Sequence, residues 1–126
     1  MRFGVDIDGT ISAMPDVFQA ICRSLMRAGH HVYVVTAARP GRHNPDKNTK
    51  AGRQAELARY GMKPGIHFDD IVLAWGDDHR AVAEAKARIC EELHLAVMFD
   101  NDPLNVAACR EVTNVLVPSD DPPVYR

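Results

Sequence analysis

The strongest constraint on the fold is the alternation of short apolar runs with helical segments along the whole chain. Runs of apolar and β-branched residues predict strands over residues 1–8, 31–36, 70–75, 95–99 and 113–117. Helical spacing of apolar residues, or strong helix formers, predict helices over 15–28, 49–60, 79–93 and 103–110. Continuous apolar runs are typical of strands buried on both faces. The sequence therefore predicts an α/β fold with a doubly wound, Rossmann-like and mainly parallel sheet of about five strands.

The length, net charge and cysteine pattern of the chain exclude several classes of protein. A length of 126 residues predicts one domain, over residues 1–126, with a core that needs no disulfide. A net charge of -2 argues against a globally basic surface for nucleic acid. Cys22, Cys90 and Cys109 lie in apolar helical stretches without CxxC spacing, which predicts buried, reduced thiols. With no apolar run of membrane-spanning length and no signal peptide, we expect a cytoplasmic protein that does not enter a membrane.

Two carboxylates, Asp6 and Asp8, stand one residue apart at the end of the first predicted strand. If the strand includes both, their side chains point the same way, because side chains alternate along a strand. Such a pair is unfavourable unless a cation or a proton lies between the two carboxylates. One carboxylate could then act as a nucleophile and the other as an acid and base. The alternative is a strand that simply ends in an Asp-Gly turn.

Further polar residues follow the other predicted strands. Thr36 and Arg39 stand at the end of the second strand, Asp100-Asn101-Asp102 follows the fourth, and Lys86 lies on the helix before it. Ligands of doubly wound sheets bind at the carboxyl ends of the strands, where the strand order switches. Carboxylates, an amide oxygen, a hydroxyl and an ammonium group together suit Mg²⁺ with a phosphoryl group.

In these residues the chain resembles the haloacid dehalogenase (HAD) superfamily of aspartate-dependent phosphohydrolases. The segment Asp6–Thr10 is similar to its DxDGT motif, Thr36 to the second motif, Lys86 to the third and Phe99–Asp102 to the fourth. The motifs follow in the family's order and span the chain. The resemblance implies a Mg²⁺-dependent phosphatase, that is, a phosphomonoester hydrolase that works through an aspartyl-phosphate intermediate.

The resemblance also implies residue roles. Asp6 would be the nucleophile and Asp8 the general acid and base, while Thr36 and Lys86 would contact the phosphoryl group. Substrate contacts are implied for Gly9, Thr10, Ala37 and Arg39. Metal ligation is implied for Asp6, Asp8, Asp100 and Asn101. Which of the last two binds Mg²⁺ directly stays open.

The substrate is less defined. Residues 10–15 and 37–48 leave no room for a cap domain, so the site is expected to be open to large substrates or closed by a second subunit of a homo-oligomer. The second half more loosely resembles the phosphatase domain of polynucleotide kinase-phosphatases, which implies a nucleotide or a nucleic-acid end as the phosphorylated substrate. Arg39, Arg42, His43 and Lys47 form a basic loop that would contact its phosphates, or else is merely solvated.

Two alternatives stay open. One is a catalytically silent binding or regulatory module on a HAD fold. The other is a receiver-like signalling domain, disfavoured because the third strand ends at Trp75-Gly76 and the last at Val117-Pro118. Trp75 is expected to pack rather than to stack on a base, and the tail over 118–126 is expected to be extended.

Overall fold

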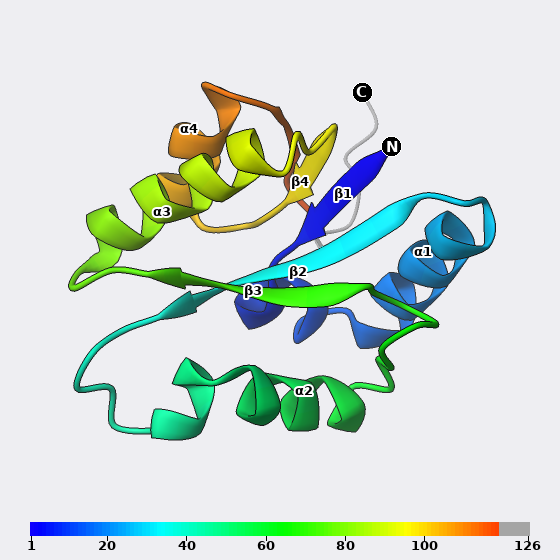
Figure 1. The fold of residues 1–126 in the computed structure, drawn as a ribbon, viewed down its shortest axis with the longest axis horizontal. Helices are drawn as coiled ribbons and strands as arrows, with labels where there is room; N and C mark the ends of the chain where they lie inside the picture. Colours follow the sequence, from blue (N-terminus) through cyan, green and yellow to red (C-terminus); the bar gives the residue numbers. More distant parts are fainter. Residues whose placement is uncertain (119–126) are drawn as a thin grey trace, which may run out of the picture.

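The computed structural model describes residues 1–118, which form one five-stranded sheet with helices on both faces (Figure 1). The strands are β1 (Arg2–Val5), β2 (His31–Ala38), β3 (Asp70–Trp75), β4 (Val97–Phe99) and β5 (Asn114–Leu116). They lie in the order β3-β2-β1-β4-β5, and every neighbouring pair is parallel. The predicted α/β fold with a doubly wound parallel sheet is confirmed. Of the tail expected to be extended, residues 119–126 lie outside the described part.

Helices cover both faces of the sheet (Figure 1). They are α1 (Pro15–Arg27), α2 (Lys50–Arg59), α3 (His79–Glu92) and α4 (Pro103–Arg110). Phe18 of α1 and Leu57 of α2 pack with Val34 of β2 in one core cluster. The next residue of β2, Val35, points to the other face and packs with Cys90 of α3. The apolar runs of the sequence therefore do mark strands that are buried on both faces.

Side-chain caps fix where three helices begin after the strand ends. Thr49 accepts a hydrogen bond from Gly52 N at 3.0 Å at the start of α2. Asp78 accepts one from Ala81 N at 2.8 Å at the start of α3. Asp102 accepts one from the backbone N–H of Leu104 at 3.0 Å at the start of α4. These caps satisfy N–H groups that have no partner within the helix. The carboxylate of Asp102 therefore has a structural role.

The strand boundaries differ from the prediction at the first strand. β1 ends at Val5, and residues 7–11 form a short turn of helical hydrogen bonding that contains Gly9 at a φ of +77°. In this turn Ser12 N donates to Ile7 O at 3.0 Å. The prediction that Asp6 and Asp8 share a strand and point the same way is therefore wrong. Similarly, β2 does not end at Thr36 but continues to Ala38.

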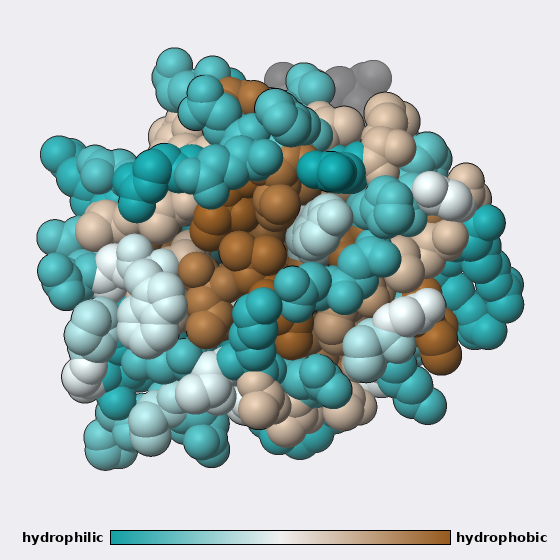
Figure 2. Space-filling model, in the orientation of Figure 1, coloured by the Kyte–Doolittle hydropathy of each residue, from teal (hydrophilic) through white to brown (hydrophobic). Residues whose placement is uncertain are grey.

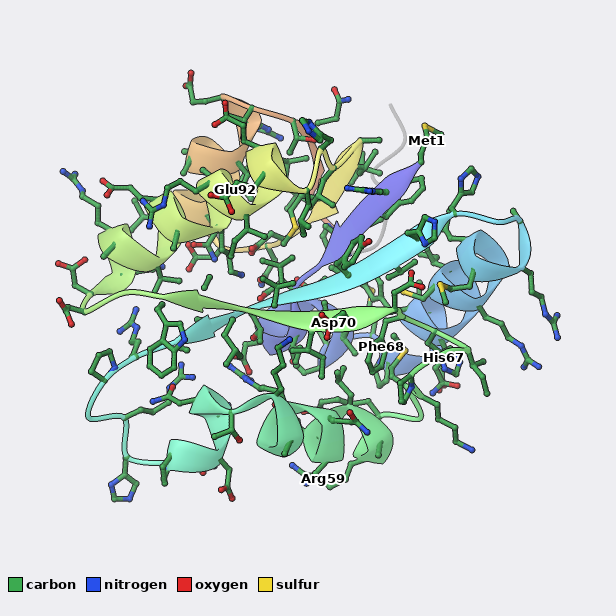
Figure 3. The ribbon with its side chains drawn as sticks, in the orientation of Figure 1. Met1, Arg59, His67, Phe68, Asp70 and Glu92 are labelled. Carbon is green, nitrogen blue, oxygen red and sulfur yellow. The ribbon has the colours of Figure 1, made fainter. Side chains whose placement is uncertain are left out.

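All five strands run in one direction, so their carboxyl ends gather at one edge of the sheet (Figure 1). The amino-terminal ends gather at the opposite edge, where Figure 3 labels Met1 at the start of the chain. The strand order switches between β1 and β4, which lie side by side although α1, α2 and α3 separate them in sequence. The carboxyl edge beside β1 and β4 is thus where a doubly wound sheet binds ligands.

The prediction of buried, reduced cysteines is confirmed within residues 1–118. Cys22, Cys90 and Cys109 are buried and free, with the sulfurs of Cys90 and Cys109 3.8 Å apart, as the prediction of buried thiols requires. No helix in this part of the chain combines the length and the apolar character needed to cross a membrane.

Candidate functional site

The first part of the site is an acid cluster, made of Asp6, Asp100 and Lys86. Asp6 follows β1, Asp100 follows β4, and Lys86 reaches them from the middle of α3. Lys86 Nζ donates to Asp6 Oδ1 at 2.7 Å and to Asp100 Oδ2 at 2.8 Å. All three side chains are buried, with exposed fractions of 6% or less. The structure thus brings together three of the residues that the sequence placed at strand ends or beside them.

The acid cluster carries one ammonium group for two carboxylates. Burial has the largest effect on Asp6 and, helped by the charge of Asp100, outweighs the attraction of Lys86 and raises the pKa of Asp6 to about 7. Burial also opposes the charge on Lys86, but the carboxylates of Asp6 and Asp100 outweigh it and raise the pKa of Lys86. The cluster therefore has an excess of negative charge that a proton or a cation would neutralise.

The second part of the site surrounds Asp8. Arg53 Nη2 donates to Asp8 Oδ2 at 3.2 Å, and Lys47 Nζ donates to Asp8 Oδ1 at 3.3 Å. Arg53 extends from α2, is fully buried, and also bonds Glu56 at 2.8 Å and Ala37 O at 3.0 Å. The carboxylate of Asp8 therefore points toward α2 and its preceding loop.

Two more arginines lie in the loop that follows β2. Arg42 Nη1 donates to the carbonyl oxygen of Ala37 at 3.2 Å, and the side chain of Asn48 accepts from Arg39 N at 2.9 Å. Arg39 Nε is buried and, within residues 1–118, has no hydrogen-bond partner. The basic cluster comprises Arg39, Arg42, Lys47 and Arg53. Its cations outnumber the carboxylates of Asp8 and Glu56 that they face.

Asp8 has the opposite electrostatic character to Asp6. Burial would raise its pKa, but the charges of Arg53 and Lys47 outweigh burial and hold the pKa of Asp8 below its usual value. The side chain is also 45% exposed, whereas that of Asp6 is 6% exposed. Asp8 is therefore ionised at neutral pH and has no proton to donate.

Thr36 lies between the two clusters. Val34 pairs with Val5 in the sheet, so Thr36 stands beside the point where the chain leaves β1. Thr36 is fully buried, yet its hydroxyl has no hydrogen-bond partner in the described part of the chain. Buried hydroxyls nearly always have a partner, so this one lacks a hydrogen bond that a group entering the edge of the sheet would supply.

Three further residues that the sequence predicts for the site, Gly9, Thr10 and Asn101, lie around the turn that follows β1. Gly9 lies directly under the side chain of Asn101, and a Cβ at position 9 would overlap it. The hydroxyl of Thr10, which is buried, donates to Asp6 Oδ2 at 3.5 Å. Asn101 itself is exposed, whereas Asp100 is fully buried. Gly9 and Thr10 therefore set the shape of the turn and the position of Asp6.

The donor set can be tested against a metal ion. Within residues 1–118 no group of three or more His, Cys, Asp or Glu side chains is arranged to hold one. Asp6 and Asp100 do converge, and the amide of Asn101 is the next residue along the chain. Mg²⁺ is commonly held by one or two carboxylates with several waters rather than by an all-protein cage. In the structure the carboxylate oxygens of the acid cluster already accept hydrogen bonds, from Lys86, from Thr10 and from the backbone of Asp102, so Mg²⁺ ligation by Asp6 and Asp100 stays a prediction.

Arg53 is the functional residue that sequence reasoning missed. It stands in a segment that the sequence marks only as a polar helix. The available signal was its spacing of four residues from Leu57, which places both on the inward face of α2. A charged residue on an inward face requires a partner of opposite charge, and here the partners are Asp8 and Glu56.

Known proteins resemble this chain in fold but not in sequence. The sequence matches no protein-family model and no curated protein sequence. Among solved structures, a universal stress protein in complex with cAMP is similar, with a TM-score of 0.62 and 13% identity, over 96% of this chain and 98% of that chain. A protein of the universal stress protein family from Burkholderia pseudomallei has a TM-score of 0.50 and 18% identity, over 93% and 94% of the two chains.

These structures correct the expectation from the sequence. They are universal stress proteins and not HAD phosphatases, so the assignment to the HAD superfamily, with its looser likeness to polynucleotide kinase-phosphatases, is wrong. The Mg²⁺-dependent phosphatase activity, which rested on that assignment, is overturned with it. The motifs misled because short runs of polar residues at strand ends recur on many α/β folds.

Proposed function

We propose that this chain is a catalytically silent binding module that holds a nucleotide by its phosphate, together with Mg²⁺, at the carboxyl edge of the sheet. The observation that carries the proposal is the buried, unpartnered hydroxyl of Thr36 between the acid cluster and the basic cluster, as the structure describes them over residues 1–118. A phosphate oxygen would give that hydroxyl the partner it lacks.

The charges on either side suit the two halves of such a ligand. The excess negative charge of Asp6 and Asp100 would hold Mg²⁺, which when bound would neutralise it and attract a phosphate oxygen. The guanidinium groups of Arg39 and Arg42 are suited to the phosphate itself, because their planar N–H groups match its oxygens. The nucleotide class is supported by the cAMP held in one similar solved structure.

The contacts of Asp8 and Asp6 favour binding over hydrolysis. A general acid needs a proton at neutral pH, and Arg53 and Lys47 keep the pKa of Asp8 low. A nucleophilic carboxylate must be free, whereas both carboxylate oxygens of Asp6 accept hydrogen bonds, from Lys86 at 2.7 Å and from Thr10 at 3.5 Å. Asp6 is therefore poorly suited to act as the nucleophile of phosphate hydrolysis, and Asp8 to act as its general acid.

The test compares the wild type with Thr36→Val and with a matched control, Thr113→Val. Calorimetric titration of the wild type with adenosine 5′-monophosphate should show saturable binding that is tighter with Mg²⁺ than without. Thr36→Val should weaken binding roughly 10-fold or more, because a hydrogen bond to a charged group is lost. Its free energy of unfolding should stay the same or rise by about 1 kcal/mol, because no hydrogen bond within residues 1–118 is lost.

Thr113→Val should behave in the opposite way. Thr113 donates to Leu95 O at 2.6 Å, at the amino-terminal end of β5, far from the carboxyl edge. The variant should lose about 1 kcal/mol of stability and keep the wild-type affinity. Equal affinities for Thr36→Val and the wild type would contradict the proposal, as would release of inorganic phosphate from the nucleotide.

A further inference from the structure

Trp75 is the one tryptophan of the chain and the last residue of β3. Half of its surface is exposed, and it is the single aromatic residue among the large hydrophobic residues exposed in residues 1–118. The two aromatic ring pairs of this part of the chain, Phe3–His30 and Phe18–Phe99, do not involve it. The expectation that Trp75 packs in the interior therefore holds for only part of the indole.

The strand register places the indole beside the candidate site. Ile71 and Leu73 of β3 pack into the same core cluster as Val34, so Trp75, two residues further on, lies on that face of the sheet. Thr36, two residues after Val34, shares the face. Trp75 pairs with Ala38 across the strands, which puts the Cα atoms of Trp75 and Thr36 about 8 Å apart by sheet geometry.

The surface around β3 is consistent with a ring-binding platform. Figure 2 shows apolar residues gathered over β3, between α2 and α3, with hydrophilic residues around them. β3 begins at Asp70 and runs to Trp75 at the carboxyl edge of the sheet. The indole therefore stands where this apolar strip reaches the edge that carries the acid and basic clusters.

The backbone of Trp75 is held in place. Gly76 N donates to Ala38 O at 3.1 Å, which ties the end of β3 to β2. A Cβ at Gly76 would overlap the backbone of Ala81 and Val82, so the turn into α3 is tightly packed. A platform on a fixed backbone binds with little loss of conformational freedom.

We infer that Trp75 is the stacking platform for the nucleobase of the ligand, with the phosphate at Thr36 and the basic cluster. This inference rests on the proposed function and specifies its ligand class, a nucleotide rather than a simple phosphate ester. An exposed indole presents a flat apolar face on which any base can stack. Trp75 and Thr36 lie on the same face of neighbouring strands, so one ligand at the carboxyl edge could contact both. The site would thus bind the phosphate and the aromatic base of one ligand at the same time.

The test uses Trp75 as its own reporter, because no other tryptophan contributes to the emission. The wild type is titrated with adenosine 5′-monophosphate, ribose 5-phosphate and adenosine, each with Mg²⁺, by fluorescence and by calorimetry. Adenosine 5′-monophosphate should quench the emission and bind roughly 5- to 100-fold more tightly than ribose 5-phosphate, the range expected for stacking of one base. Ribose 5-phosphate should bind without quenching.

The variants Trp75→Leu and Trp75→Phe, with Ile66→Ala as control, complete the test. Trp75→Leu should lose the preference for adenosine 5′-monophosphate and keep its affinity for ribose 5-phosphate, while Trp75→Phe should keep part of the preference. Ile66 is 45% exposed in the turn before β3, at the other edge of the sheet, so Ile66→Ala should leave both affinities unchanged. Thermal unfolding of each variant verifies that it folds.

The outcomes separate the inference from the proposed function. Equal binding of the two phosphates without quenching overturns the stacking role of Trp75 and leaves the phosphate-binding module standing. Trp75 fluorescence that changes with protein concentration but not with added nucleotide also overturns the stacking role, because a second copy of the chain would then cover the indole. If no phosphate ligand binds, the proposed function fails, and the inference fails with it.

Discussion

The acid cluster and the basic cluster hold two aspartates that stand one residue apart in the chain, yet they treat the two carboxylates in opposite ways. Asp6 shares one buried ammonium group, that of Lys86, with a second carboxylate, and its pKa rises to about 7. Asp8 has two cations to itself, is half exposed, and its pKa falls. The difference arises because β1 ends before Asp6, so the two side chains leave the backbone toward opposite layers of the fold.

The comparison shows how one edge of a sheet can attract both halves of a metal–phosphate ligand. α3 contributes a single cation to the two carboxylates of the acid cluster, which is buried. α2 and its preceding loop contribute several cations to the basic cluster, which stays net positive and partly solvated. The acid cluster is therefore suited to the cation of such a ligand, and the basic cluster to its anion.

Among variants that test the contrast between the acid cluster and the basic cluster, Lys86→Met should change the unfolding free energy most. It leaves Asp6 and Asp100 buried without a counter-charge, which should cost about 3–5 kcal/mol of unfolding free energy. The matched variant in the basic cluster, Lys47→Met, removes a cation that is 35% exposed and should cost about 1 kcal/mol or less. Urea unfolding of both variants checks the difference. Similar losses would mean that the two clusters do not differ in burial as described.

The next effect is from Asp6→Asn, which should stabilise the protein at neutral pH. The folded state holds a proton on Asp6 up to about pH 7, whereas the unfolded chain loses it near 3.8. The stability from this proton is full below about pH 4 and is lost as the pH rises through about 7. Asp6→Asn should therefore flatten that decline and gain on the order of 1–3 kcal/mol at pH 7 and above. Unfolding free energies measured from about pH 4 to about pH 8 provide the check, and a loss of stability at the upper end of that range would contradict it.

The smallest effect is from Asp8→Asn, and it has the opposite sign. Because the pKa of Asp8 is lowered on folding, its stabilisation is present above the unfolded pKa and is lost as the pH falls below it. The side chain is 45% exposed, so solvent screens the pair with Arg53 and the loss at pH 7 should be about 1 kcal/mol or less. The same series of unfolding measurements distinguishes this variant from Asp6→Asn. Stabilisation by Asp8→Asn at neutral pH would remove the contrast between the two aspartates.

The sequence was sufficient for the parts of the molecule that follow from periodicity. The apolar runs at 31–36 and 70–75 correctly predict β2 and β3, and the alternation with helices predicts the parallel sheet. The rule that strand ends gather at one edge correctly brings Asp6, Asp100 and Lys86 together.

The rest of the site depends on tertiary structure. The direction of Asp8 depends on where β1 ends, and the turn over residues 7–11, with Gly9 in the left-handed conformation, begins earlier than the apolar pattern indicates. The part played by Arg53 depends on the packing of α2 against the sheet, which composition alone does not reveal. The family assignment was wrong because it relied on a few short motifs, while the arrangement of the whole chain is similar to universal stress proteins.

The most direct test of the central claim is a phosphorus NMR titration of adenosine 5′-monophosphate with the wild-type protein and Mg²⁺. Binding without chemistry predicts that the phosphate signal shifts or broadens as the protein is added, and that no inorganic phosphate signal grows during prolonged incubation. Growth of an inorganic phosphate signal, or a nucleotide signal that the protein leaves unchanged, would contradict the account.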